Sequence, residues 1–355
     1  MTIAVPVAFA DEGLTAEIAE DLAVVEAALR DTSFGGDVMF SDVSRHMMEA
    51  GGKRFRAMLV LLAARFGDCR DKRIVPAAVA IELTHLATLF HDDVMDEALI
   101  RRGLPSANSR WSNTIAILTG DFLFARASNL LADLGPDAIR IQAQTFTRLV
   151  SGQVAETLGP QPGQEPLAHY LRVVEDKTAS LIATAGRFGA MFAGAPRDVV
   201  DRICSASHAL GVAFQLSDDI LDVASESAES GKEPGTDLRE GVRSLPVLHV
   251  LAAPSGQDGD RLRELLSRDG LTDESLHAEA LALLRAHPAM DAARADLARW
   301  VAVAHGEIAG LPDVPARHAL AAICDFVSDR SSCRRQRPPA PVPSGERTRH
   351  GGLVP

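Results

Sequence analysis

The stretch HLATLFHDDVMD, residues 85–96, ends an apolar run in three carboxylates. On a helix, side chains four residues apart share a face, with about 5–6 Å between Cβ atoms. Asp92 and Asp96 therefore point the same way, and Asp93 flanks them. Like charges at this spacing repel unless a cation lies between them, and Mg²⁺ with substrate phosphates is a natural occupant. A solvated acidic helix end explains a single copy of this pattern equally well.

A second copy of the pattern favours the metal-binding interpretation. The sequence FQLSDDILD, residues 214–222, repeats the acidic spacing on another apolar run, 126 residues further on (218 − 92). Its carboxylates are Asp218, Asp219 and Asp222. Two facing triads would form a cage for several divalent ions, which surface charge does not explain.

Composition predicts an all-α protein. Of the 355 residues, 46% are hydrophobic and only 5% are aromatic, with a single tyrosine. We find no sustained alternation of apolar and polar residues that would mark a strand. We expect one helical domain over residues 1–330 and a disordered Arg- and Pro-rich tail over residues 331–355.

The charge distribution argues against a nucleic-acid partner. The net charge is −12, and the residues from Arg330 onward carry six Arg and one Glu, or +5, so the preceding body carries −17 (−12 − 5). A body this acidic repels phosphate backbones. The basic tail allows at most a peripheral contact with an anionic membrane.

Cysteine usage and the N-terminus indicate the compartment. The four cysteines are scattered without a Cys-x-x-Cys pair, which indicates a reducing compartment and no zinc site or disulfide framework. The N-terminal residues lack the basic segment of a signal peptide, and no apolar run reaches the about 18 residues of a membrane span. We therefore expect a soluble, cytoplasmic protein.

Apolar periodicity predicts helices along most of the chain. The expected helices cover residues 14–30, 37–50, 58–66, 74–96, 112–133, 137–157, 166–193, 197–224, 245–253, 260–267, 276–286, 290–308 and 315–328. Residues 224–241, rich in Gly, Ser and Glu, are expected to form a long loop of the kind that often acts as a lid.

Three basic stretches accompany the acidic runs. In GGKRFR, residues 51–56, two glycines let the backbone turn tightly and hold cations near an anion. Arg101 and Arg102 follow the first acidic run, and guanidinium groups bind phosphate oxygens bidentately. Lys177 and Thr178 lie on an expected helix. Each stretch also has an ordinary explanation: a helix junction, a chance basic pair in a loop, or an exposed turn.

The residue types near the acidic runs indicate chemistry without a protein nucleophile. Near the acidic runs there is no Gly-x-Ser-x-Gly, P-loop, dinucleotide-binding or zinc signature. Metal ions on carboxylates, together with Lys and Arg, stabilise a departing diphosphate. Apolar helix walls would shelter the carbocation that remains.

The motifs between residues 51 and 246 resemble, in order, those of the trans-isoprenyl diphosphate synthases, or polyprenyl synthetases. They are GGKRFR, HLATLFHDDVMDEALIRRG, GDFLFA, GQ, KTA, FQLSDDILD and GKEPGTDLREGVRSLPV. The resemblance implies an all-α bundle around a central cavity between the Asp-rich motifs, usually as a homodimer. It also implies head-to-tail addition of isopentenyl diphosphate to an allylic diphosphate.

The resemblance also assigns roles to single residues. The two metal motifs, which would hold three Mg²⁺ on the allylic diphosphate, are Asp92, Asp93 and Asp96, and Asp218, Asp219 and Asp222. The residues that match the isopentenyl diphosphate site are Lys53, Arg56, His85 and Arg102. Those that match the allylic side are Arg101, Lys177, Thr178, Gln215 and Lys232. Lys177 joins Asp92, Asp93, Asp96, Asp218 and Asp219 as catalytic residues.

One segment departs from the family pattern. Where many members have a lysine after the second motif, this chain has Val242 and then Arg243, and Ser244 replaces the common threonine. Either Arg243 substitutes for the lysine or one diphosphate contact is missing. We expect activity to survive because Lys177 and Lys232 remain.

Product length follows from the residues one turn before Asp92. By the family geometry the growing chain passes Ala87 and Thr88, which are both small. Small side chains leave the cavity open and predict a long-chain polyprenyl diphosphate, with geranylgeranyl diphosphate as the alternative.

Two other functions compete with this prediction. A class I terpene cyclase shares the helical fold and the first acidic motif but lacks the isopentenyl diphosphate site. A non-catalytic subunit of a synthase usually loses one acidic motif, and this chain keeps both.

Overall fold

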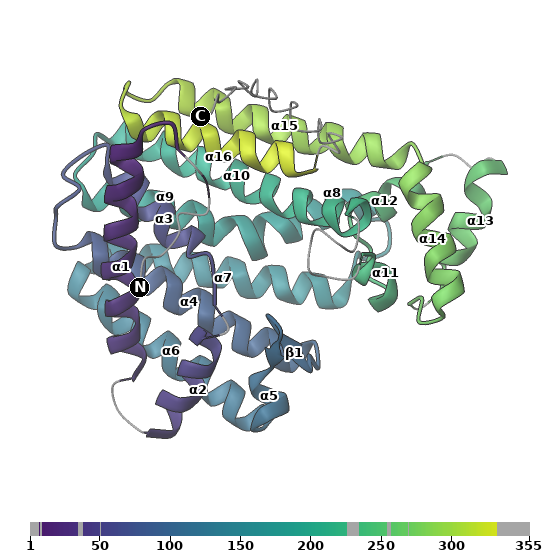
Figure 1. Cartoon of the computed structure of the whole chain (residues 1–355), viewed down its shortest axis with the longest axis horizontal. Coiled ribbons are helices and arrows are strands. Elements are labelled where there is room, and N and C mark those ends of the chain that lie inside the picture. The colour runs from purple at the N-terminus through teal and green to yellow at the C-terminus, as the bar shows by residue number, and fades with distance from the viewer. Residues whose placement is uncertain are drawn as a thin grey trace, which may run out of the picture.

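The computed structural model describes residues 7, 9–34, 38–49, 51–225, 234–253, 257–268 and 270–331, and helices form nearly all of their regular structure (Figure 1). The helices of the first half are α1 (Glu12–Phe34), α2 (Val38–Glu49), α3 (Phe55–Ala64), α4 (Ile74–Met95), α5 (Ala107–Arg110), α6 (Asn113–Leu134) and α7 (Pro136–Leu158). Those of the second half are α8 (Pro166–Val173), the π-helix η1 (Val174–Ala179), α9 (Ser180–Phe192), α10 (Arg197–Ala224), α11 (Thr236–Glu240), α12 (Leu245–Ala252), α13 (Gln257–Leu266), α14 (Glu274–Ala286), α15 (Ala289–Ala309) and α16 (Pro315–Ser331). The all-α prediction is confirmed.

The centre of the bundle is built around α4. This helix is apolar on nearly all sides, and such a helix is stable only when it is buried. It packs against α1, α3, α6 and α9, with Phe90 fully buried. The first acidic motif forms the C-terminal end of α4, so its carboxylates lie at the edge of the core.

Two of the described helices, α4 and α6, are long and apolar enough to span a membrane by length and composition. The expectation that no run has this length is therefore wrong. In α4, 67% of the apolar window is buried inside the bundle, which is the property of a core helix. In α6 only 33% is buried, so this helix keeps an exposed apolar face.

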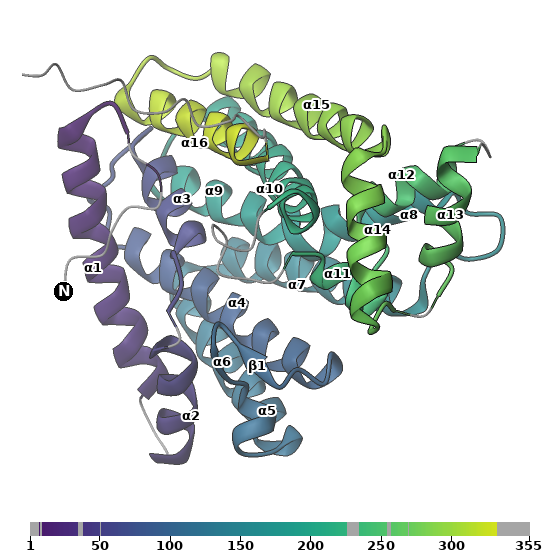
Figure 2. The same cartoon turned by 45° about the vertical axis from the view of Figure 1, so that its right-hand side comes forward.

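The second acidic motif ends α10, which packs against α9, α12, α15 and α16. The element that follows α4 is β1, and the one that follows α10 is α11. Both lie toward the same end of the bundle in two views (Figures 1 and 2). The carboxylate ends of the two helices therefore open in the same direction.

A short β-hairpin follows the first motif, where the sequence indicates no strand. Strands β1 (Ile100–Arg101) and β2 (Leu104–Pro105) pair antiparallel. The turn residues Arg102 and Gly103 both have positive φ, 52° and 80°, which is the requirement of a type I′ turn. The hairpin holds the two adjacent arginines beside the acidic end of α4.

A π-helical turn interrupts the helix expected over residues 166–193, which divides into α8, η1 and α9. Helix α7 makes room for this turn at Gly152, where a Cβ atom would lie 2.6 Å from the Lys177 backbone nitrogen. Arg148 of α7 donates to the Glu175 carbonyl at 3.2 Å and to the Asp176 carboxylate at 2.7 Å. Packing against α7 thus stabilises a backbone form that is rare and frequent at functional sites.

The loop expected over residues 224–241 contains helix α11 near its end, which the Gly-rich composition did not indicate. Its expected role as a lid concerns mainly residues 226–233, which include Lys232. These residues lie outside the described part of the chain. The expected tail over residues 331–355 also lies outside them, except for Ser331, which ends α16.

Candidate active site

The first acidic motif presents its three carboxylates in different environments. Asp93 is fully buried and accepts a 2.6 Å hydrogen bond from Arg101 Nε at Oδ1. Its other oxygen, Oδ2, is buried and has no hydrogen-bond partner among the described residues. Asp92 is partly buried, and Asp96 is exposed. An unsatisfied buried oxygen beside two further carboxylates suits a cation.

Electrostatics at Asp92 show the same need for positive charge. Burial raises the pKa of Asp92 to about 6, and the nearby charges of Asp96 and Glu156 add to the increase. The ammonium group of Lys177 acts in the opposite direction. The first motif therefore lacks a full complement of cations within the described protein.

In the second motif, Asp219 is held by the protein itself. Its carboxylate accepts hydrogen bonds from Tyr170 Oη at 2.6 Å, from the Leu245 backbone N–H at 2.9 Å and from Gln215 Nε2 at 3.0 Å. Burial raises the pKa of Asp219, and these three donors oppose the increase. Asp219 thereby connects α10 to α8 and to the start of α12.

The other two carboxylates of the second motif also have protein partners. Asp222 accepts hydrogen bonds from the backbone N–H groups of Thr236 and Asp237, each at 3.1 Å, at the N-terminus of α11. Asp218 forms an ion pair with Arg330 of α16, although its side chain stays 41% exposed. The Asp218 carboxylate is thus accessible, in contrast to that of Asp219.

The π turn η1 lies between the two motifs. Lys177 forms an ion pair with Glu156 of α7, and its charge reaches Asp92 of the first motif. The next residue, Thr178, donates to Gln215 Oε1 at 3.4 Å, and Gln215 in turn contacts Asp219 of the second motif. The consecutive residues Lys177 and Thr178 therefore connect one turn to both acidic motifs, Lys177 by its charge and Thr178 through Gln215.

One cavity unites the residues that match the isopentenyl diphosphate site. Lys53, Arg56, His85 and Arg102, which come from the start of α3, from α4 and from the hairpin, all line a cavity of about 180 Å³. Arg330 lines it as well and so connects this cavity to Asp218. Residues as far apart in the sequence as Lys53 and Arg330 therefore line one cationic pocket.

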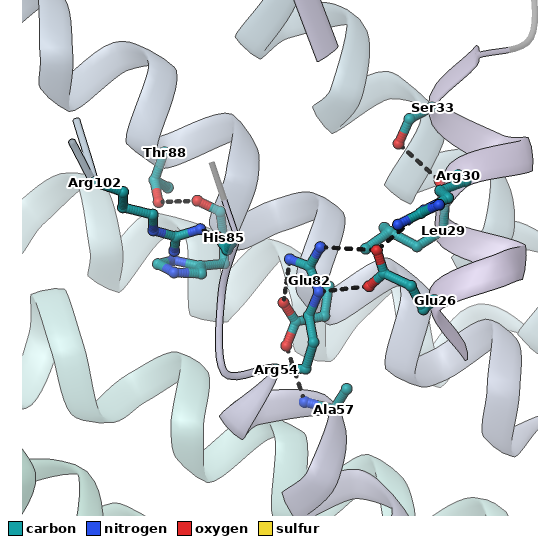
Figure 3. Close-up of polar contacts among 11 residues, drawn as sticks. Glu26, Leu29, Arg30, Ser33, Arg54, Ala57, Glu82, His85, Thr88 and Arg102 are labelled. Atoms are coloured by element: carbon teal, nitrogen blue, oxygen red, sulfur yellow. Dashed lines mark hydrogen bonds and ion pairs between the residues drawn. The ribbon is translucent and has the colours of Figure 1, made fainter. Parts of the chain in front are cut away.

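The cationic pocket has unused capacity for an anion. Arg56 Nε is buried without a hydrogen-bond partner among the described residues, and burial lowers the pKa of its guanidinium. Burial and the neighbouring Arg56 and Arg102 hold the pKa of His85 well below its usual value, so its imidazole is neutral at pH 7. Figure 3 shows the Arg102 side chain beside the His85 ring. A diphosphate would supply the missing negative charge.

The remaining predicted residues lie in two different places. Ala87 is 1% exposed and Thr88 is partly buried, with its hydroxyl bonded to the His85 carbonyl at 2.8 Å. Arg243 and Val242 line a separate cavity between α11, α12 and α13. Whether Arg243 replaces the lysine or one contact is missing stays open.

No preformed metal cage is present in the part of the chain that the structure describes, because no three His, Cys, Asp or Glu side chains come together there. The metal-binding role of the two triads stays a prediction. Mg²⁺ commonly binds through one or two carboxylates and the phosphates of its substrate, and Asp92, Asp96 and Asp218 suit that mode.

Sequence reasoning missed several residues of the site. Glu82 is a single carboxylate within the apolar run of α4, and a buried charge in such a run is itself a signal. Tyr170, the only tyrosine, and Arg330, at the end of the last helix, gave no signal because their partners are remote in the sequence.

The fold, the two acidic motifs and the cationic pocket together define a class of protein that handles diphosphates. The profile of the polyprenyl synthetase family matches residues 37–284, and the chain belongs to this family of prenyltransferases.

Individual relatives extend the match to nearly the whole chain. Nonaprenyl diphosphate synthase of Mycobacterium tuberculosis is 48% identical over 330 residues, which cover 93% of this chain and 98% of the relative. Among solved structures, geranylgeranyl pyrophosphate synthase of Corynebacterium glutamicum, complexed with calcium and isoprenyl diphosphate, matches with a TM-score of 0.83 at 42% identity, covering 92% of this chain and 99% of that one. Decaprenyl diphosphate synthase of Rhodobacter capsulatus matches with a TM-score of 0.81 at 36% identity, covering 90% and 99%.

Proposed function

We propose that this protein is a trans-polyprenyl diphosphate synthase that adds isopentenyl diphosphate head to tail to an allylic diphosphate. The observation that carries the proposal is the cationic pocket, in which Lys53, Arg56, His85 and Arg102 line one cavity. A terpene cyclase has no second diphosphate to bind and no use for this pocket. A non-catalytic subunit would not need two complete acidic motifs.

The proposed cofactor is Mg²⁺, three ions by family resemblance. The orphaned oxygen of Asp93 and the raised pKa of Asp92 support a cation at the first motif. Asp92, Asp96 and Asp218 would hold the metal together with the substrate phosphates, and the bound metal would neutralise the charge of the diphosphate as it departs. The calcium in the Corynebacterium glutamicum structure supports a divalent ion.

The residues of this chain serve the proposed reaction by binding and charge stabilisation. The bond between the allylic carbon and the diphosphate oxygen breaks first. The double bond of isopentenyl diphosphate then attacks that carbon, and the released diphosphate takes the proton that the isopentenyl unit loses. Lys177, Thr178, Gln215, Arg101 and Lys232 would bind the allylic diphosphate. The buried apolar walls of α4 and α9 would exclude water from the allylic carbocation.

We propose a long-chain product. The small side chains of Ala87 and Thr88 and the likeness to synthases named for nonaprenyl and decaprenyl products support it. Geranylgeranyl diphosphate is the second candidate, supported by the likeness to the Corynebacterium glutamicum enzyme. Ala87→Phe should shorten the product, whereas Ala87→Ser should keep the parent length. Unchanged chain length on chromatography after Ala87→Phe refutes the role of this position.

The reaction itself is tested with farnesyl diphosphate, labelled isopentenyl diphosphate and Mg²⁺, followed by product sizing. The expected result is one long prenyl diphosphate. Consumption of the allylic substrate alone with release of a hydrocarbon would indicate a cyclase, and no product from the purified protein would indicate a non-catalytic subunit. Full turnover after both aspartate triads are changed to alanine would also overturn the proposal.

We further propose that the enzyme is a homodimer and cytoplasmic. Helices α6 and α7 carry a row of exposed large apolar side chains, which a second copy would cover. They are Ile117, Leu118, Ile139, Val150, Val154 and Leu158. Leu118→Glu should shift the mass in light scattering from dimer to monomer, and a wild-type monomer would contradict the proposal.

A further inference from the structure

Between the two substrate-binding cations of the GGKRFR segment lies a third cation with a different environment. Arg54 is 6% exposed, and its backbone adopts the left-handed conformation with φ 48° and ψ 36°. This conformation is uncommon for a residue with a Cβ atom and persists only where the surroundings hold it. Its neighbours Lys53 and Arg56 line the cationic pocket, so the turn at Arg54 sets where both of them point.

Two carboxylates hold the side chain of Arg54 (Figure 3). Its Nε donates to Glu26 Oε2 at 2.7 Å and its Nη2 to Glu26 Oε1 at 3.2 Å, which is a bidentate pair. On the other side, Arg54 Nη1 lies 3.8 Å from Glu82 Oε2. The guanidinium thereby connects α1 with α4 across the start of α3.

Glu82 also caps helix α3. Its Oε1 accepts the backbone N–H of Ala57, in the first turn of α3, at 3.0 Å. The residue at the N-cap position is Arg54, whose side chain offers no acceptor, so the carboxylate from α4 takes that role. Because Glu82 is only 3% exposed, it contributes this cap and its charge from within the core.

The charge of Glu82 faces the whole cationic pocket. It favours the protonated forms of Arg54, Arg56 and Arg102, while Arg54 disfavours the charge of Arg102 and Arg102 that of Arg56. Arg102 in turn donates to the Gly51 carbonyl and so ties the hairpin to the glycine turn. Without an anion in the pocket, Glu82 is the buried carboxylate that keeps these guanidinium groups together.

We propose that Glu82 and Arg54 are positioning residues that keep the isopentenyl diphosphate pocket assembled before the substrate arrives. Both residues also line the cavity. Their charged groups pair with each other, with Glu26 and with the start of α3, and they act on the substrate by fixing Lys53 and Arg56. The inference rests on the proposed function, because it names what prepares one of its two substrate sites.

The physical alternative makes an opposite prediction. If Glu82 acted only as a negative charge near the pocket, its removal would strengthen the attraction for a diphosphate and lower KM for isopentenyl diphosphate. If Glu82 positions the pocket, its removal releases the cap of α3 and lets the guanidinium groups separate. KM for isopentenyl diphosphate then increases.

The test is steady-state kinetics of Glu82→Gln with both substrates and Mg²⁺. We expect KM for isopentenyl diphosphate to increase about tenfold, equal to about 1.4 kcal/mol. KM for the allylic diphosphate should stay within about twofold of the wild-type value, because Lys177 and the second motif are untouched. A lower or unchanged KM for isopentenyl diphosphate overturns the inference, and so does an equal increase in both KM values.

Two further variants separate the backbone turn from the side-chain contacts. Arg54→Gly keeps the left-handed turn without strain but removes the contacts to Glu26 and Glu82, so KM for isopentenyl diphosphate should still increase. Arg54→Lys keeps one donor and should restore part of the affinity. Wild-type KM in Arg54→Gly would overturn the role of the side chain.

The matched control is Arg30→Ala, which removes the exposed partner of Glu26 on the far side of the same network. It should leave both KM values unchanged. Thermal unfolding shows which variants are folded, and Glu26→Gln, a milder change at the same guanidinium, replaces Glu82→Gln if the latter does not fold. Wild-type protein that consumes no isopentenyl diphosphate defeats the proposed function itself, whereas active wild-type with an unaffected Glu82→Gln defeats only this inference.

Discussion

The two acidic motifs have the same sequence spacing but different relations to the rest of the protein. In the first, on α4, Asp93 has one orphaned oxygen, and the pKa of Asp92 is raised to about 6. In the second, on α10, Asp219 accepts three hydrogen bonds and Asp222 caps α11. In the first motif, part of the carboxylate charge lacks partners, while the second motif uses much of its charge to hold the fold.

The middle aspartates show what the motifs share. Asp93 is fully buried and Asp219 is 6% exposed, and each accepts a strong hydrogen bond from a neighbouring segment. Asp93 holds the hairpin through Arg101, and Asp219 holds α8 through Tyr170. A repeated sequence pattern therefore divides into accessible residues, which we propose face the substrate, and residues that fix the helix ends. We derive four predictions from this division.

The largest effect is expected at the accessible carboxylates. Asp92→Ala and Asp218→Ala should each lower kcat on the order of a thousandfold, because each would remove a proposed anchor of the metal and diphosphate. The measurement is initial rate at saturating substrates over a range of Mg²⁺ concentrations. Asp291→Ala, at an exposed carboxylate of α15, is the control and should leave the rate unchanged. Near-normal rates for Asp218→Ala would mean that only the first motif carries the chemistry.

The second prediction concerns stability at Asp219. Tyr170→Phe removes the hydroxyl that donates to the Asp219 carboxylate, and a hydrogen bond to a charged group contributes about 1.5–3 kcal/mol. The free energy of unfolding, measured with denaturant, should fall by that amount. Tyr170 lies outside the metal-binding groups, so kcat should fall far less than in Asp218→Ala. An unchanged stability would contradict the structural role of Asp219.

The third prediction is a pH dependence of stability at Asp92, measured without metal or substrate. Its pKa in the folded protein, about 6, exceeds the ordinary value of 3.8 for an aspartate, so ionisation of Asp92 opposes folding. The penalty appears as pH rises from about 4 through about 6 and, after solvent screening, amounts to about 1–2 kcal/mol. Asp92→Asn should therefore gain stability over wild-type at pH 7 but not at pH 4. A constant difference across this range would show that the charge of Asp92 is compensated.

The smallest effect is expected at the π turn between the motifs. Arg148→Ala removes the donor to the Glu175 carbonyl and the pair with Asp176, which should cost about 0.5–1.5 kcal/mol of stability. Because the turn carries Lys177 and Thr178, KM for the allylic diphosphate should rise while KM for isopentenyl diphosphate stays constant. The reverse pattern would place η1 with the other substrate.

Much of the fold and the site could be predicted from local sequence. The helix around residues 74–96 and its acidic end follow from periodicity and spacing, because an apolar helix must be buried whatever surrounds it. The convergence of Lys53, Arg56, His85 and Arg102 was predicted through family resemblance, and their common cavity agrees with it.

The rest depends on contacts between segments far apart in the chain. The π turn forms because Gly152 and Arg148 of α7 accommodate it, and no pattern within residues 166–193 encodes those contacts. The hairpin strands contain two residues each, too few for alternation to be visible. The internal role of Asp219 depends on Tyr170 and Leu245, which the motif spacing does not reveal.

The π turn has a consequence for how the chain can be compared or redesigned. One extra residue in a helical turn corresponds to about 100° of rotation about the axis. The segments before Val174 and after Ala179 therefore follow two separate angular registers, although the ribbon is continuous. The wide turn absorbs the extra residue, so deleting one residue here would restore a regular helix and leave α9 at the same angular position. An alignment or redesign that treats residues 166–193 as one regular helix therefore misplaces every side chain on one side of η1 by about 100°.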